Sequence, residues 1–122
     1  MKLHLSRAGT RNSITGYGER HVLVNGQREA ASVIVLGERI LPWQAVRFDE
    51  LAAQDFEIFH GLDLEIVLLG TGPRQRFPHP RLTAGLAAAG IGLEVMSLQA
   101  ACRTYNILIA EERRVAAALL FE

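Results

Sequence analysis

The sequence predicts one α/β domain in which helices cover a mainly parallel central sheet. The chain has 122 residues, which is a common size for a single domain. Hydrophobic residues make up 49% of it and charged residues 21%, and this balance excludes a disordered chain. From residue 32 onward, short apolar runs alternate with segments of helical periodicity in the order β-α-β-α-β-α-β. Such alternation is typical of parallel strands joined by crossover helices, and no linker or repeat interrupts it, so we expect residues 1–122 to form a single domain.

The N-terminal third favours β-structure and an N-terminal β-hairpin. Residues 1–5 alternate between apolar and polar side chains as a strand does, and another short strand is expected at 21–24. The Asn-Gly pair at 25–26 follows it, and this dipeptide is the strongest short signal for a hairpin. A continuous, β-branched run at 32–36 indicates a strand buried on both faces, and 40–46 is expected to be extended.

Three helices and three further strands make up the rest of the predicted domain. Helical periodicity places the helices at 49–60, 80–89 and 97–110, and apolar runs place buried strands at 64–69, 91–95 and 115–121. Pro80 stands where the second helix begins, and proline is well tolerated in the first turn of a helix. Ser97 can cap the third helix. We expect the three strands to share one sheet with the strand at 32–36.

The composition excludes several classes of protein. Thirteen basic residues balance thirteen acidic ones, whereas a dedicated nucleic-acid binder usually carries a basic excess. The single cysteine excludes a disulfide framework and a cysteine-based zinc site. The four histidines have no zinc-like spacing, so no metal site is expected. No cofactor is expected either. No apolar run reaches the roughly 18 residues that a membrane-spanning helix needs.

The start of the chain bears on its compartment. Residues 1–18 contain Lys2, Arg7 and Arg11 and no acid, a pattern shared with mitochondrial transit peptides. Strand-like alternation at 1–5 favours the start of a folded domain instead, and no apolar segment of secretory type follows. Together with the lone thiol, these features lead us to expect a cytoplasmic protein.

A loop rich in glycine, proline and arginine joins the strand at 64–69 to the helix at 80–89. Ligands of open α/β sheets bind where strands end in this way, and the free N–H groups at a helix start attract anions. No Asp or Glu occurs between Ile66 and Leu93, and arginine offers a planar fork for carboxylate or phosphate. The candidate anion-binding residues are Gly70, Thr71, Gly72, Arg74, Arg76 and His79.

Known phosphate-binding motifs do not match this loop. A P-loop requires a lysine after its glycines, and Lys2 is the only lysine of the chain. A dinucleotide fingerprint that starts at Gly70 requires glycine at the position of Gln75. The alternative is a surface loop, stiffened by proline, whose arginines are solvated or ion-paired. His79 then caps the helix that begins at Pro80 rather than taking a catalytic role.

Two further sets of residues are candidates for chemistry. Glu94 lies inside the strand predicted at 91–95, where a buried carboxylate requires a cation, and Arg103 on the next helix is its expected partner. This buried ion pair either fixes the helix to the sheet or holds a general base. Tyr105 is expected to point inward from that helix, and Asn106 to share its polar face with Arg103. That face either lines a groove or is solvated.

Three stretches occur in order along the chain. They are Leu68-Leu69-Gly70-Thr71-Gly72, Gly90-Ile91-Gly92-Leu93-Glu94-Val95-Met96 and Ala101-Cys102-Arg103-Thr104-Tyr105-Asn106, followed by a final apolar strand. Together with Trp43 they resemble the Mth938-like family of small domains, which includes the mitochondrial respiratory complex I assembly factor three. The resemblance implies a three-layer αβα sandwich with a mixed sheet. It implies a protein partner, with respiratory-complex subunits as the candidates. It implies neither an established enzyme activity nor known catalytic residues.

Two functions are therefore considered. The first is a non-enzymatic protein-interaction or assembly-factor-type module. The alternative is a small anionic-ligand-binding protein or enzyme that uses the loop Gly70–Arg81. A module of the first kind exposes an apolar patch with aromatic or arginine anchors, whereas the second has a closed pocket with convergent polar groups.

Overall fold

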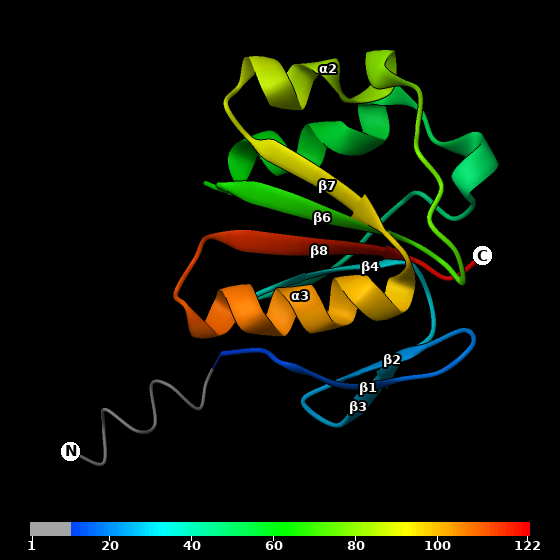
Figure 1. The fold of residues 1–122 in the computed structure, drawn as a ribbon, viewed down its shortest axis with the longest axis vertical. Coiled ribbons are helices and arrows are strands. Elements are labelled where there is room, and N and C mark those ends of the chain that lie inside the picture. Colours follow the sequence, from blue (N-terminus) through cyan, green and yellow to red (C-terminus); the bar gives the residue numbers. More distant parts are fainter. Residues whose placement is uncertain (1–10) are drawn as a thin grey trace.

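Two β-sheets, packed together with helices, form the part of the chain that the computed structural model describes, residues 11–122 (Figure 1). The predicted strand at 1–5 lies outside these residues. The small sheet contains β1 (Ile14–Tyr17), β2 (Val22–Val24) and β3 (Gln27–Glu29). The central sheet contains β4 (Val33–Leu36), β5 (Ile40–Pro42), β6 (Ile66–Thr71), β7 (Gly92–Met96) and β8 (Val115–Leu120). The helical elements are η1 (Phe48–Glu50), η2 (Ala53–Gly61), α2 (Pro80–Ala88) and α3 (Leu98–Ala110).

The central sheet is mixed, as the family resemblance implies, but it is not mainly parallel. Its strand order is β5-β4-β8-β6-β7, so the four predicted strands lie in one sheet, as expected. The pairs β8–β6 and β6–β7 are parallel, whereas β4–β5 and β4–β8 are antiparallel. The difference arises because β4 turns directly back into β5 and because β8 inserts between β4 and β6.

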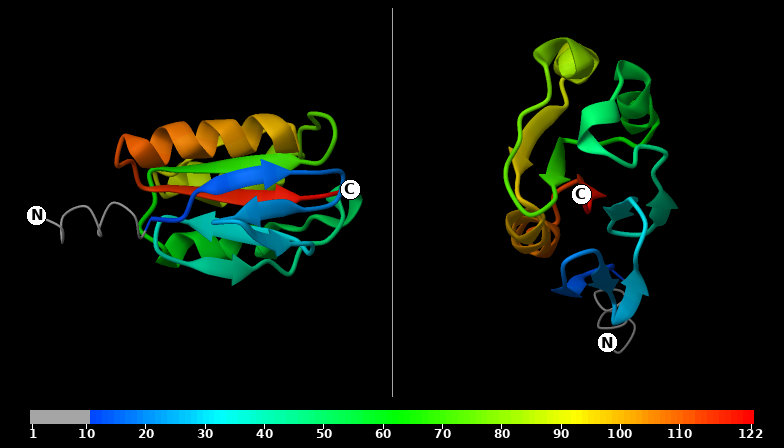
Figure 2. Two further views of the ribbon diagram at one scale, coloured as in Figure 1. Left: turned by 90° about the horizontal axis from the view of Figure 1, so that it is seen from below. Right: turned by 90° about the vertical axis from the view of Figure 1, so that its right-hand side faces the viewer.

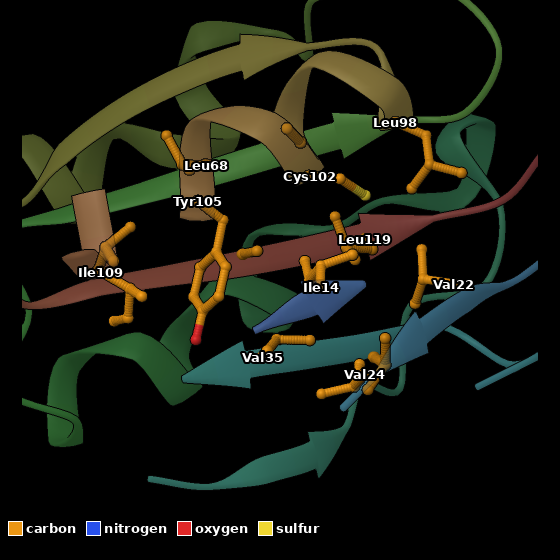
Figure 3. Packing of buried hydrophobic residues seen from close by; sticks show 14 of the residues in the cluster. Ile14, Val22, Val24, Val35, Leu68, Leu98, Cys102, Tyr105, Ile109 and Leu119 are labelled. Carbon is orange, nitrogen blue, oxygen red and sulfur yellow. The ribbon is translucent and has the colours of Figure 1, made fainter. Parts of the chain in front are cut away.

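Both faces of the central sheet are covered. Figure 2 shows α3 on one side of the sheet and η2 on the other, with the small sheet beside α3. All six residues of β8 are buried, and its three alanines leave room for the elements on each face. Figure 3 shows Leu98, Cys102, Tyr105 and Ile109 of α3 against β8, and Ile14, Val22 and Val24 of the small sheet complete this half of the core.

The opposite face packs against Trp43, Phe56 and Phe59, whose rings meet at centroid distances of 5.9 to 6.2 Å. The helix predicted at 49–60 is replaced by two 3₁₀ segments, η1 and η2. Long-range contacts of Asp55 fix this segment, because its backbone carbonyl accepts a hydrogen bond from the Trp43 indole at 2.9 Å. Its carboxylate accepts the Ala52 N–H at 2.9 Å.

The small sheet is fixed to α3 by a network of amides. The predicted hairpin is present as β2–β3, and Asn25 and Gly26 adopt the positive φ angles of 53° and 83° that its turn requires. The side chain of Asn25 donates to Asn12 Oδ1 at 2.7 Å. Asn12 Nδ2 donates to Leu36 O at 2.8 Å, and the Tyr105 hydroxyl donates to Asn12 O at 3.0 Å. Asn12 therefore connects the small sheet, β4 and α3.

We expect Asn12→Ala to lower the free energy of unfolding by about 2–4 kcal/mol, because it leaves the buried Leu36 carbonyl without this partner and removes the hydrogen bond to Asn25. Chemical denaturation measures the change. Gln54→Ala is the control, since Gln54 is exposed and its truncation should change stability by less than about 0.5 kcal/mol. Equal stability of the two variants would contradict a central role for Asn12.

Candidate functional site

The loop between β6 and α2 is organised around the hydroxyl group of Thr71. This side chain is fully buried at the end of β6. Its Oγ1 donates to Arg74 O at 2.6 Å and accepts the Arg76 N–H at 3.0 Å. The loop therefore folds back on the end of its own strand, and the Thr71 hydroxyl is not directed at solvent.

Arg76 binds the chain itself. Its Nη2 donates to Thr71 O at 2.9 Å and also to the main-chain oxygen of Glu122. The guanidinium carbon lies 4.6 Å from the centroid of the Phe48 ring. Its Nε is buried without a hydrogen-bond partner among residues 11–122. Arg76 thus clamps the loop to the segment that follows β8, in contrast to the expected role in anion binding.

The glycines of this loop are explained by close approaches within the protein. A Cβ on Gly70 would lie 3.0 Å from Leu119 and 3.1 Å from Ala101, so Gly70 lets α3 and β8 pack closely. Gly72 has a φ of +85°, and a Cβ there would lie 3.1 Å from the backbone of Glu122. These contacts give both glycines a packing role.

The crevice expected at the carboxyl ends of β6 and β7 is closed by hydrogen bonds. The connections that leave these two strands lead to helices on opposite faces of the sheet. In open α/β proteins, ligands bind outside the strand ends at the point where two connections diverge in this way. Here the Leu98 N–H donates to Gly72 O at 2.7 Å. Gln75 Nε2 donates to Val95 O at 2.9 Å.

The other candidate residues of the loop lie at the surface. His79 accepts the Arg81 N–H on Nδ1 at 3.1 Å, so it caps α2, as the structural alternative expected. The side chains of Arg74 and Arg81 are exposed. An anion site in this loop remains a prediction, and these two arginines are the residues that face solvent.

The predicted buried ion pair is wrong. Glu94 is exposed, and the structure contains no ion pair between it and Arg103, which is exposed on α3. The sequence pattern suggested a strand covered on both faces, but β7 lies at the edge of the sheet, where the Glu94 carboxylate reaches water. Neither a structural ion pair nor a buried general base is formed.

Tyr105 and Asn106 do not line a groove, because the small sheet covers them. Asn106 pairs with the backbone of Ile14, accepting its N–H at 2.9 Å and donating to its carbonyl at 2.8 Å. Tyr105 is buried, and desolvation raises the pKa of its hydroxyl. Burial likewise raises the pKa of the neighbouring Cys102 to about 11, which is unfavourable for a reactive thiolate.

Several hollows mark the surface of residues 11–122. One of about 640 Å³ lies between Tyr17 to Arg20, Gly72 to Pro73 and the start of α3. A hollow of about 270 Å³ lies beside it, and both are bordered by Arg20, Phe121 and Glu122. The Glu122 carboxylate pairs with Arg20 at 3.4 Å and with Arg47 at 2.9 Å. Sequence reasoning missed this cluster, because residues 20 and 122 lie far apart along the chain.

Another hollow, about 320 Å³, lies at the opposite end of the sheet and is lined by charges of both signs. Close to it, a hydrogen bond from Arg113 lowers the pKa of Glu65. No group of three or more His, Cys, Asp or Glu side chains in the described part of the chain is arranged to hold a metal ion. None of its helices is long and apolar enough to cross a membrane.

Truncation of Arg76 tests its role as a clamp. We expect Arg76→Ala to lower the free energy of unfolding by about 2–3 kcal/mol, because it removes two hydrogen bonds and the contact with Phe48. Arg74→Ala removes the same charge from an exposed position and should have little effect. Thermal and urea unfolding measure both variants, and equal losses would contradict the clamp.

Titration with inorganic phosphate tests the anion prediction. We expect weak binding, roughly millimolar, with amide shifts in residues 72–81 that diminish as salt is added. An Arg74→Ala, Arg81→Ala double variant should bind more weakly, because these side chains face solvent. Unchanged amide positions in 72–81, or identical titrations of both proteins, would exclude an anion site that uses these arginines.

Comparison with known proteins places this domain among relatives. Residues 14–120 match the family described as "Protein of unknown function (DUF498/DUF598)". A zebrafish "NADH dehydrogenase [ubiquinone] 1 alpha subcomplex assembly factor 3" is 32% identical over 109 residues, which are 88% of this chain and 63% of that protein. The chain spans about three fifths of the length of such assembly factors.

Solved structures agree with this match. A crystal structure of a Bordetella parapertussis protein has a TM-score of 0.86 at 39% identity and covers 91% of this chain and 96% of that one. An NMR structure of a Bordetella pertussis protein, described as a Mth938-like domain, has a TM-score of 0.78 at 34% identity, with coverage of 89% and 85%. The chain therefore belongs to the DUF498/DUF598 family of Mth938-like domains, the family that includes complex I assembly factor 3.

Proposed function

We propose that this domain is a non-enzymatic, cytoplasmic interaction module of assembly-factor type, and that its partners are subunits of a respiratory complex. The observation that carries the proposal is the similarity to complex I assembly factors across 88% of the chain. Because the chain spans only part of those proteins, their partners are transferred here as a proposal.

The chemistry of the β6–α2 loop supports a binding role over a catalytic one. Thr71 and Arg76 are the candidate residues of the loop whose polar groups point into the protein. Both donate hydrogen bonds to backbone oxygens of the protein and so do not face a substrate. Phe77, by contrast, is 70% exposed beside the Arg76 clamp. Exposed aromatic side chains on a fixed backbone are frequent anchors of protein interfaces. We therefore place the partner contact at Phe77.

Affinity purification from the source cells tests this function. The wild-type domain should retain respiratory-complex subunits, identified by mass spectrometry, and Phe77→Ser should lose them. Ile107→Ser is the matched control, because Ile107 is an exposed apolar residue at 58% on the distant helix α3. A retained small anionic metabolite without respiratory subunits would overturn the proposal in favour of a ligand-binding protein or enzyme. Equal losses from both variants would exclude Phe77 as the anchor.

A further inference from the structure

The edge strand β7 presents backbone groups to the outside of the domain. It ends the central sheet and pairs with β6 alone among the described strands (Figure 1). The Gly92 N–H donates to Glu65 O at 2.8 Å, so the main-chain groups of Gly92, Glu94 and Met96 face β6. Those of Leu93 and Val95 therefore face outward.

At each end of β7, one outward-facing backbone group is already hydrogen-bonded within the protein. The Ile91 N–H donates to Leu86 O at 2.9 Å, and Val95 O accepts from Gln75 Nε2 at 2.9 Å. The outward-facing N–H and C=O of Leu93 lie between these two hydrogen bonds. The remaining edge strands are shorter or blocked. β3 and β5 have three residues each, β5 ends at Pro42, and Asn106 occupies both backbone groups of Ile14 on β1.

We propose that β7 pairs antiparallel with β7 of a second copy of this chain, about a two-fold axis at Leu93. In this register the Leu93 N–H of each copy donates to the Leu93 carbonyl of the other, because both groups point outward from the same residue. The pairing joins two five-stranded sheets into one continuous sheet.

The Glu94 carboxylate, the charged group of β7, favours the register centred at Leu93 over the one centred at Glu94. With the axis at Leu93, the Glu94 carboxylate lies opposite Gly92 of the second copy, which has no side chain. With the axis at Glu94, the two carboxylates would face each other, which is destabilising. That alternative would also require Val95 O, which Gln75 already occupies. Backbone complementarity and charge therefore favour the same pairing.

Internal hydrogen bonds limit the length of the new ladder. The next pair of residues would join Val95 O to the Ile91 N–H of the second copy. Both groups are already bonded within each copy, to Gln75 and to Leu86 O, so the contact centres on Leu93. Gln75 is exposed, and its side chain is free of the core. The internal bonds of Val95 O and of the Ile91 N–H together limit the length of the ladder and keep association weak.

Sedimentation of the purified domain with charge variants of Gly92 tests the register. Gly92 is exposed, and an added Cβ would meet no atom closer than 3.5 Å. Gly92→Lys places a cation opposite Glu94 of the second copy and should tighten dimerisation by about 2- to 30-fold, whereas Gly92→Glu should weaken it by a similar factor. Added salt should reduce the difference. The same dimerisation constant for both variants would overturn the Leu93-centred register.

Backbone variants test the edge itself. Leu93→Pro removes an outward N–H without removing a bond to β6 and should abolish dimerisation, while Leu93→Ala keeps the N–H and is the control for the lost side chain. Gln75→Ala should leave dimerisation nearly unchanged, because the Ile91 N–H that would meet Val95 O in this register already donates to Leu86 O. Thermal melting confirms that each variant is folded. A wild type that stays monomeric up to about 1 mM, or an undiminished Leu93→Pro dimer, would overturn the proposal.

Discussion

The fold depends on the placement of its last strand at the centre of its main sheet. β8 hydrogen-bonds to β4 on one side and to β6 on the other, so it joins the N-terminal and C-terminal halves of the domain. Every residue of β8 is buried, and the run Ala116 to Ala118 lets α3 approach on one face and the aromatic cluster around Trp43 on the other. The central sheet is therefore complete only when the final residues of the domain are in place, and the contacts that build it are long-range ones.

This constraint explains the loop that carries the most suggestive sequence pattern. Glycine and arginine after a strand are typical of anion sites, yet here Gly72 and Arg76 contact the segment that leaves β8. A buried central strand is stable only when the segment that leaves it is held in place. The Arg76 guanidinium holds it by donating hydrogen bonds to both Thr71 O and Glu122 O. The same residue types that bind a ligand in other α/β proteins thus stabilise the sheet in this one.

The surfaces left for partners follow from the same architecture. The small sheet covers the polar face of α3, so Tyr105 and Asn106 are used internally. The edge strand β7 and the exposed ring of Phe77 remain outside these internal contacts. Both lie on or next to the β6–α2 loop, which contacts β7 through Gln75.

The sequence by itself determined the elements whose cause is local. Apolar runs predicted the positions of β4, β6 and β8, periodicity predicted α2 and α3, and Asn25-Gly26 predicted the hairpin. The tertiary structure alone decided the strand order, and with it the exposure of Glu94, because a strand at an edge and a strand at the centre share the same short apolar pattern. It also decided the partners of Asn12 and Arg76, which lie 93 and 46 residues away in Tyr105 and Glu122. Local sequence fixes backbone preference, whereas the partner of a polar side chain depends on which distant segment the folded chain brings against it.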